Sequence, residues 1–139
     1  MRSGTIQCDR QTPTIKQVED GLTHNNPLVR EEWVNRMDWT PTPEQVEVGL
    51  KDNKWIVRLA WARRMDWTPT PEQVERGILD DDRDLRVAWV KRMDWTPTHA
   101  QIERGVNDPS REVRDAWMAR LKVEQEKLLM DVHATGASL

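Results

Sequence analysis

Phenylalanine and tyrosine are absent from this chain of 139 residues, cysteine occurs once, and the net charge is only −3 at pH 7. The lone cysteine, Cys8, excludes a disulfide within the chain and a cysteine-rich metal site. No apolar run is long enough to span a bilayer, and the N-terminus lacks the apolar core of a secretory signal. Bulk attraction to nucleic acid or to an anionic membrane is not expected from so small a charge. These absences predict a cytoplasmic protein that does not contact membranes.

The only aromatic residue is tryptophan, of which there are eight, and it recurs with a fixed period. The triplet Thr-Pro-Thr begins at Thr12, Thr40, Thr68 and Thr96, so the period is 28 residues. A period between about 20 and 50 residues is typical of repeat arrays. We therefore expect an all-α fold, a right-handed α-solenoid of four 28-residue helix-pair repeats covering residues 12–39, 40–67, 68–95 and 96–123.

Each repeat is expected to contain two short helices. In the second repeat Thr42 can cap the first helix, with Pro43 at its first position and Gln45 completing a capping box. A constant glycine, Gly49 in this repeat, is expected to let the second helix approach closely. The second helix is expected to be capped by the aspartates at equivalent positions, which are Asp52, Asp80 and Asp108, with Pro109 at the first helical position of the last copy. Its apolar stripe would consist of Val57, Ala60, Trp61 and Met65.

The heptapeptide RMDWTPT occurs three times, at Arg36–Thr42, Arg64–Thr70 and Arg92–Thr98. As a functional motif, its aspartate and tryptophan would form a repeated ligand clamp. As a structural motif, the tryptophan fills the gap between neighbouring repeats while the aspartate binds backbone donors or an arginine. Because an array must bury every repeat against its neighbour, the second interpretation is favoured. Arg64 lies close to the apolar stripe, so it is expected to have a carboxylate partner.

The repeat resembles the HEAT-like α-solenoids, particularly those of the leucine-rich-repeat-variant type. The resemblance rests on TPEQVERG (Thr70–Gly77), DDDRDLR (Asp80–Arg86) and VAWVKRMDWTPT (Val87–Thr98), and it covers about residues 12–123. The period of 28 residues is shorter than a standard HEAT unit and longer than the usual variant repeat. The iron–sulfur domain that some variant proteins carry is not expected, because its clustered cysteines are missing. The resemblance implies a curved array of helix pairs with a concave surface for partners.

Recognition is expected at exposed positions that vary between repeats, since constant positions build the scaffold. On the second helices these positions include Leu28 in the first repeat. We predict a partner-binding surface made of Trp55, Ile56, Leu59, Arg63, Arg83, Val87, Lys91 and Arg111. Leu59 and Val87 point away from the apolar stripe, so both are expected to be exposed. Aromatic and arginine residues are common in binding hot spots. The alternative is that these apolar residues pack against a neighbouring helix or loop.

The predicted function is that of a non-enzymatic protein-binding module, either an adaptor or an inhibitor, without a cofactor. Nucleic-acid binding through a basic concave face is the alternative, because the second helices of the middle repeats are rich in cations: Arg58, Arg63, Arg64, Arg83, Arg86, Lys91 and Arg92. The three histidines show neither metal-ligand spacing nor an adjacent nucleophile. A catalytic or metal site is therefore not predicted.

The two ends of the chain depart from the repeat. Residues 1–11 are expected to be a flexible leader, and residues 124–139 a helix extension followed by a flexible tail. Trp117, Leu121, Leu128 and Val132 would share one face of the extended helix. That face would cover the open apolar edge of the last repeat. A homodimer through this C-terminal helix is the second possibility.

Overall fold

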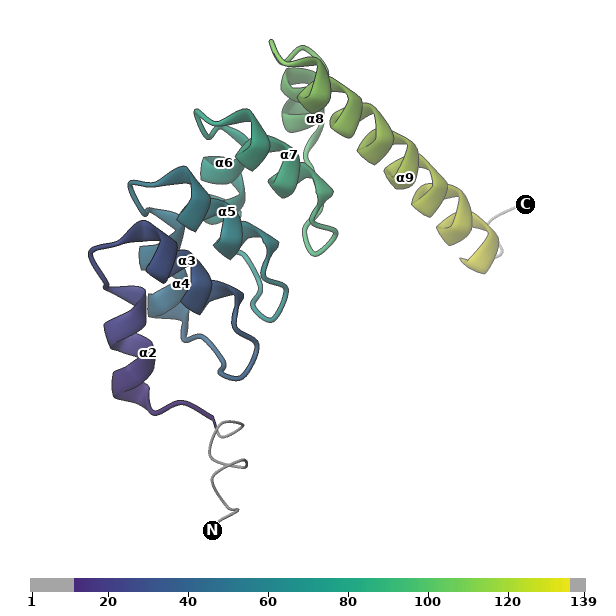
Figure 1. Ribbon diagram of the computed structural model, residues 1–139. Coiled ribbons are helices and arrows are strands. Elements are labelled where there is room, and N and C mark those ends of the chain that lie inside the picture. Colours follow the sequence, from purple (N-terminus) through teal and green to yellow (C-terminus); the bar gives the residue numbers. More distant parts are fainter. Residues whose placement is uncertain (1–11, 136–139) are drawn as a thin grey trace. The chain divides into compact units, whose positions relative to one another are not determined.

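The computed structural model describes residues 12–135, and all regular secondary structure in this part of the chain is helical (Figure 1). The predicted all-α fold class is therefore confirmed for these residues. The helices in chain order are α2 (Ile15–Leu22), α3 (Pro27–Asn35), α4 (Pro43–Leu50), α5 (Trp55–Arg63), α6 (Pro71–Ile78), α7 (Arg83–Lys91), α8 (His99–Gly105) and α9 (Arg111–Thr135). The expectations for Cys8 and for the leader and the last four residues concern parts outside the described range.

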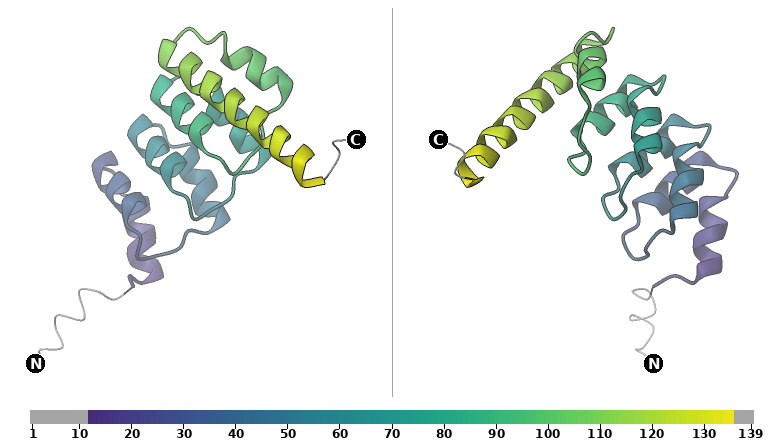
Figure 2. Two further views of the ribbon diagram at one scale, coloured as in Figure 1. Left: turned by 90° about the vertical axis from the view of Figure 1, so that its right-hand side faces the viewer. Right: turned by 180° about the vertical axis from the view of Figure 1, so that it is seen from behind.

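The chain divides into two compact units, Met1–Thr68 and Pro69–Leu139. The boundary falls at the first residue of the third Thr-Pro-Thr triplet, so each unit holds two of the 28-residue sequence repeats. In the first unit α2 packs on α3, α4 packs on α5, and α3 and α5 lie side by side. The second unit has the same pairing, with α6 on α7, α8 on α9, and α7 beside α9 (Figure 2).

The first helix of every repeat begins with the predicted capping box. In α4 the Thr42 hydroxyl accepts the Gln45 N–H at 3.1 Å, and the Gln45 side chain accepts the Thr42 N–H at 2.8 Å. The same reciprocal pair is present at Thr14, Thr70 and Thr98. This arrangement provides hydrogen-bond acceptors for two backbone N–H groups that would otherwise have none in each helix. It thereby fixes the residue at which the helix starts.

The predicted caps of the second helices are wrong by two residues. Asp52 accepts the N–H of Lys54 at 2.9 Å, and Lys54 is the N-cap of α5. Asp80 and Asp108 likewise accept the N–H two residues further on. An aspartate that bonds its own backbone two residues later forms a turn ahead of the helix. For the same reason α9 begins at Arg111 instead of at Pro109.

The core of each repeat is a tryptophan of the second helix packed on the glycine of the first. Trp61 is buried, and a β-carbon at Gly49 would collide with its indole ring. Val57 and Ala60 are buried with it, as predicted. Met65 is not part of this stripe: α5 ends at Arg63, Arg64 has an extended backbone, and Met65 is consequently exposed.

Helix α9 continues through the point where the other second helices end and runs to Thr135. The reason is local, because Lys122 and Val123 replace the Asp-Trp of the joint and no Thr-Pro-Thr follows. The second half of α9 extends beyond α7 and α8 (Figures 1 and 2). Leu128 and Val132 are exposed on it, so the prediction that they cover the edge of the last repeat is wrong.

Candidate functional site

The repeated RMDWTPT heptapeptide forms a structural joint in the first unit. Arg64 is buried, and its Nη1 donates to the carbonyls of Val34 and Arg36, both at 2.8 Å. Its Nη2 donates to the carbonyl of Trp39 at 2.5 Å. The guanidinium therefore binds the end of α3 and the chain that follows it, which belong to the preceding repeat.

The carboxylate partner of Arg64 is Asp66, two residues further along the same joint. Nε and Nη2 of Arg64 donate to the two Asp66 oxygens at 2.8 and 2.9 Å. These hydrogen bonds, supported by the positive charge, hold the pKa of Asp66 below its usual value. The aspartate that a ligand clamp would need is thus already occupied, as the structural interpretation predicts.

The last joint lacks this aspartate but keeps the arginine. Arg120 is buried, and its Nη1 donates to the carbonyls of Val90 and Arg92. Its Nε donates to Glu124 at 2.9 Å, one turn further along α9. Burial alone would raise the pKa of Glu124, but the hydrogen bond and charge of Arg120 outweigh it, and the pKa is lowered. Glu124 therefore replaces the missing aspartate within a continuous helix.

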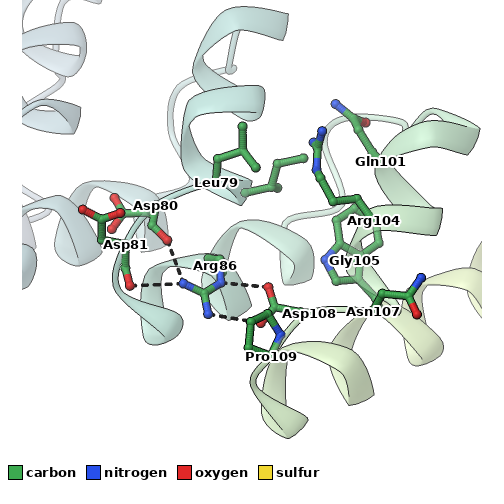
Figure 3. A pocket seen from close by; sticks show the side chains of 12 residues that line it. Leu79, Asp80, Asp81, Arg86, Gln101, Arg104, Gly105, Asn107, Asp108 and Pro109 are labelled. Carbon is green, nitrogen blue, oxygen red and sulfur yellow. Dashed lines mark hydrogen bonds and ion pairs between the residues drawn. The ribbon is translucent and has the colours of Figure 1, made fainter.

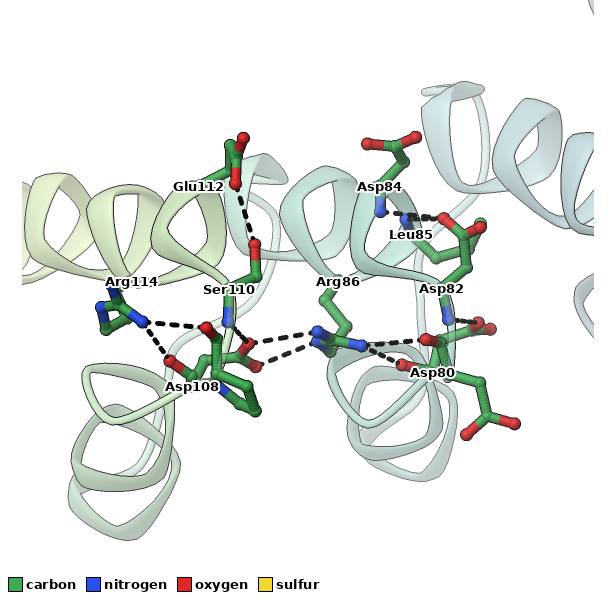
Figure 4. Close-up of polar contacts among 11 residues, drawn as sticks. Asp80, Asp82, Asp84, Leu85, Arg86, Asp108, Ser110, Glu112 and Arg114 are labelled. Atoms are coloured by element: carbon green, nitrogen blue, oxygen red, sulfur yellow. Dashed lines mark hydrogen bonds and ion pairs between the residues drawn. The ribbon is translucent and has the colours of Figure 1, made fainter.

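A second arginine of the second helix, Arg30 in the first unit and Arg86 in the second, forms an ion-pair ladder with an aspartate of the following repeat. Arg86 donates to both oxygens of Asp108 at 2.9 and 3.1 Å, and to the carbonyls of Asp80 and Asp81 (Figure 4). Arg30 binds Asp52 in the same way in the first unit. These arginines and aspartates stabilise the contact between successive repeats, so they are not free to bind a ligand.

A hollow of the second unit lies beside this ladder, between α6, α8 and the turns that follow them (Figure 3). Its volume is about 480 Å³, and Leu79 and Arg104 line it from opposite sides. The lining includes no histidine, cysteine, serine or threonine. An equivalent hollow of about 220 Å³ lies between α2 and α4. A nucleophile and a base are not brought together in the larger hollow.

The predicted partner-binding residues of the first unit are only partly available. Trp55 is 44% exposed, Arg63 is exposed and Ile56 is half-buried. Leu59 is only 8% exposed, so the prediction that it lies on the surface is wrong. The physical reason is that α5 packs against both α3 and α4, so more than one of its faces is covered. The alternative interpretation, packing against a neighbour, applies to Leu59.

In the second unit the predicted residues are mainly charged. Arg83 and Lys91 are exposed on α7, Val87 between them is half-buried, and Arg111 is exposed on α9. Arg111 forms an ion pair with Asp115 at 3.6 Å, on the same exposed face. Glu112 has a lowered pKa because its own backbone and the Ser110 hydroxyl donate hydrogen bonds and Arg83 contributes positive charge. Opposite charges therefore alternate on this surface.

The two units differ in the residue types at equivalent positions of their second helices. The first two positions of α3 and α5 are Pro27 and Leu28, and Trp55 and Ile56, whereas those of α7 and α9 hold Arg83, Asp84, Arg111 and Glu112. Leu28 is 61% exposed. We refer to Leu28, Trp55 and Ile56 as the apolar cluster. Leu28 is one of the positions that vary between repeats. It is assigned to the apolar cluster only because α3 and α5 pack side by side.

The basic surface of the second helices is smaller than the sequence predicts. Arg64 and Arg92 are buried, with Asp66 and Asp94 as their partners. Arg86 forms an ion pair with Asp108 in the ladder. The cations that stay exposed among those predicted are Arg63, Arg83 and Lys91. A continuous basic face is therefore not formed within either unit.

Within residues 12–135 no group of three or more His, Cys, Asp or Glu side chains is arranged to hold a metal ion. The same residues contain no helix with the length and apolar character needed to cross a bilayer. Comparison with models of protein families, with curated proteins and with solved structures gives no match for this chain.

Proposed function

We propose that this chain is a HEAT-like helical-repeat module, a right-handed α-solenoid of four repeats, that binds a protein partner and catalyses no reaction. The sequence period and the recurrence of the same joint in both units support the solenoid arrangement. The partner would dock on the second helices, with the apolar cluster as its anchor. Such a module acts as an adaptor or as an inhibitor that occludes its partner. A cytoplasmic location remains a prediction of the composition.

The observation that carries this proposal is the apolar cluster itself. Leu28, Trp55 and Ile56 stand where the second unit has charged residues on the same kind of helix. Since Arg83 and Asp84 are compatible with the scaffold, the scaffold does not require apolar side chains there. Exposed leucine and tryptophan lower solubility, and tryptophan is enriched at the centres of protein interfaces. A binding role explains why they are present.

Charge around the cluster supports a protein partner with acidic groups. Lys54 precedes Trp55 directly, and Arg63 follows Ile56 by seven residues on the same face of α5. Both cations are exposed, and neither has an anionic partner among residues 12–135. Exposed charges at the rim of an interface act mainly on the association rate and on specificity. Nucleic acid is less well supported, because the other arginines of these helices are engaged within the scaffold.

The test is affinity capture from nuclease-treated source lysate with a Leu28→Glu, Trp55→Arg, Ile56→Asp variant, which transfers the charged residues of the second unit. Val48→Glu is the matched control, because it changes net charge by the same −1 at an exposed apolar residue of α4. Helicity and melting temperature should be equal in all three proteins. A protein captured by the wild type and the control but not by the triple variant supports the proposal. Equal capture by all three overturns it, and capture that requires intact nucleic acid favours the nucleic-acid alternative.

A further inference from the structure

The hollow between α2 and α4 in the first unit carries carboxylates that no cation among residues 12–135 neutralises. Its charged lining consists of Glu19, Arg30, Glu44 and Asp52. Arg30 donates to both oxygens of Asp52 at 2.9 and 3.0 Å, so these two charges neutralise each other. Glu19 and Glu44 are exposed and form no ion pair within residues 12–135. The hollow is therefore anionic.

The equivalent place in the second unit is occupied by an arginine of the chain itself. Two repeats further along the chain, Glu75 stands at the position of Glu19, and Arg104 stands at the position of Val48. Arg104 lines the hollow of the second unit (Figure 3), and its Nη2 donates to Glu75 Oε2 at 3.0 Å. The other oxygen of Glu75 accepts the side-chain amide of Gln101 at 2.9 Å. Both oxygens of this carboxylate are thus bound.

The first unit has only half of this arrangement. One oxygen of Glu19 accepts the side-chain amide of Gln45 at 2.7 Å, as Glu75 does from Gln101. Its other oxygen has no donor within residues 12–135. Val48, which replaces the arginine, lines the hollow and is 70% exposed. An unbound carboxylate oxygen and an open apolar wall consequently lie on the same hollow.

Glu44 makes the difference between the two units larger. It lies four residues before Val48, so both side chains are on one face of α4. The residue equivalent to Glu44 in the second unit is Ala100. Compared with the second unit, the first unit lacks a cation at this hollow and has one further anion. The charge at the hollow is therefore complementary to a basic group supplied from outside the chain.

We propose that this hollow binds an arginine side chain of a protein partner. Its guanidinium donates to the free oxygen of Glu19, as Arg104 donates to Glu75, and Glu44 contributes a second carboxylate. The methylene groups of the arginine lie on Val48, because arginine buries its aliphatic part on apolar surface while its charged head stays accessible. The volume of about 220 Å³ fits one side chain, since pockets for drug-sized ligands have about 300–1,000 Å³.

The inference is independent of the proposed partner-binding site on the second helices. It uses neither the apolar cluster nor the cations at its rim, and it requires a basic group where that site favours acidic ones. A glutamate at position 48 keeps the hollow anionic, so capture by the Val48→Glu control does not depend on this inference. Each proposal can therefore fail without the other.

The experiment titrates the ¹⁵N-labelled full chain with the blocked tripeptide acetyl-Ala-Arg-Ala-amide and follows amide and indole N–H signals by NMR. The signals of Gly49 and Trp61, which line the hollow, should shift and saturate with a dissociation constant in about the millimolar range. The matched probe carries citrulline, which has the length of arginine but a neutral head group. It should bind at least about threefold more weakly, because the ion pair is missing.

Three variants connect the binding to the hollow. Glu19→Gln keeps an acceptor for Gln45 but removes the charge, so the arginine probe should bind at least about threefold more weakly. Val48→Arg supplies the arginine from the chain itself and should abolish saturable binding. Met37→Arg is its matched control, because it adds the same charge to an exposed apolar residue of the same unit that does not line the hollow. This control should bind the probe like the wild type.

The proposal is overturned if the wild type shows no saturable shift up to about 50 mM peptide, well above the millimolar range. Equal affinity for the arginine and citrulline probes overturns it as well, and so does unchanged affinity in Glu19→Gln. The melting temperature of every variant is measured first. Should Val48→Arg melt at a lower temperature than the wild type, Glu19→Gln and Glu44→Gln decide the outcome, because both preserve the shape of the side chain.

Discussion

The indole of Trp61 occupies the space that a β-carbon on Gly49 would need, so these two residues define how closely α4 and α5 pack. The same relationship recurs between Gly21 and Trp33, Gly77 and Trp89, and Gly105 and Trp117. Glycine costs about 1 kcal/mol relative to alanine inside a helix. The close packing of the tryptophan compensates for this cost at all four positions.

Gly49→Ala should therefore destabilise the protein although alanine favours helices. Overpacking of a core costs about 1–3 kcal/mol, and the gain in helix propensity offsets at most about 1 kcal/mol of it. Urea unfolding followed by circular dichroism measures the free energy of unfolding. In a Trp61→Leu background the same substitution should cost less, because the smaller side chain leaves room for the β-carbon. Equal costs in both backgrounds would contradict the packing explanation.

Arg64→Lys and Arg36→Lys should differ strongly although they change the same residue of the same motif. Lysine cannot bind the carbonyls of Val34 and Trp39 and the carboxylate of Asp66 at once, and its charge would stay buried. We expect a loss of about 3 kcal/mol for Arg64→Lys. Arg36 is more exposed, so its substitution should cost less than about 1 kcal/mol. Thermal unfolding of both variants at low protein concentration provides the comparison.

The pKa of Asp66 predicts how stability changes with pH. Its folded pKa lies below the ordinary value because Arg64 donates two hydrogen bonds to it, whereas the unfolded chain has the ordinary pKa, about 3.9. The stabilisation is therefore complete above the ordinary pKa and is lost as the pH falls through the folded pKa. Asp66→Asn should be less stable than the wild type at pH 7 and should lose less stability between about pH 4 and pH 2. Parallel stability curves for the two proteins would contradict this.

Lys54→Asn should stabilise the protein, because α5 has no side chain that caps its N-terminus. Asn26 and Asp82 cap α3 and α7 at the equivalent position. A side-chain cap is worth about 1 kcal/mol. Thermal unfolding should show a higher melting temperature, and Asp82→Ala should lower it by a comparable free energy. An unchanged melting temperature in Lys54→Asn would indicate that the backbone N–H groups in the first turn of α5 already have other hydrogen-bond acceptors.

Much of the scaffold could be predicted from the period. Thr42, Pro43 and Gln45 define a helix start by local hydrogen bonds alone, and the structure has this start in every repeat. The same holds for the joint, where the partner of Arg64 is only two residues away. Positions whose environment is set by their sequence neighbours are the ones that pattern analysis describes well.

The candidate site was predicted less well, because exposure depends on neighbours that are distant in sequence. Leu59 points away from the stripe of α5, yet α3 and α4 both pack on that helix and bury it. Leu28 lies 27 residues before Trp55, and only the packing of α3 beside α5 assigns both to one surface. Several arginines that look like a basic face are bound to carbonyls and aspartates of an adjacent repeat.

The sequence by itself determined the all-α class, the start of the first helix of each repeat and the identity of the repeated joint, since these follow from capping, proline and short-range hydrogen bonds. The tertiary structure decided which side chains stay exposed. It left Leu28 and Trp55 exposed and buried Leu59. The physical reason is that burial is a property of packed neighbours, which a periodic sequence pattern does not specify for each copy of the repeat.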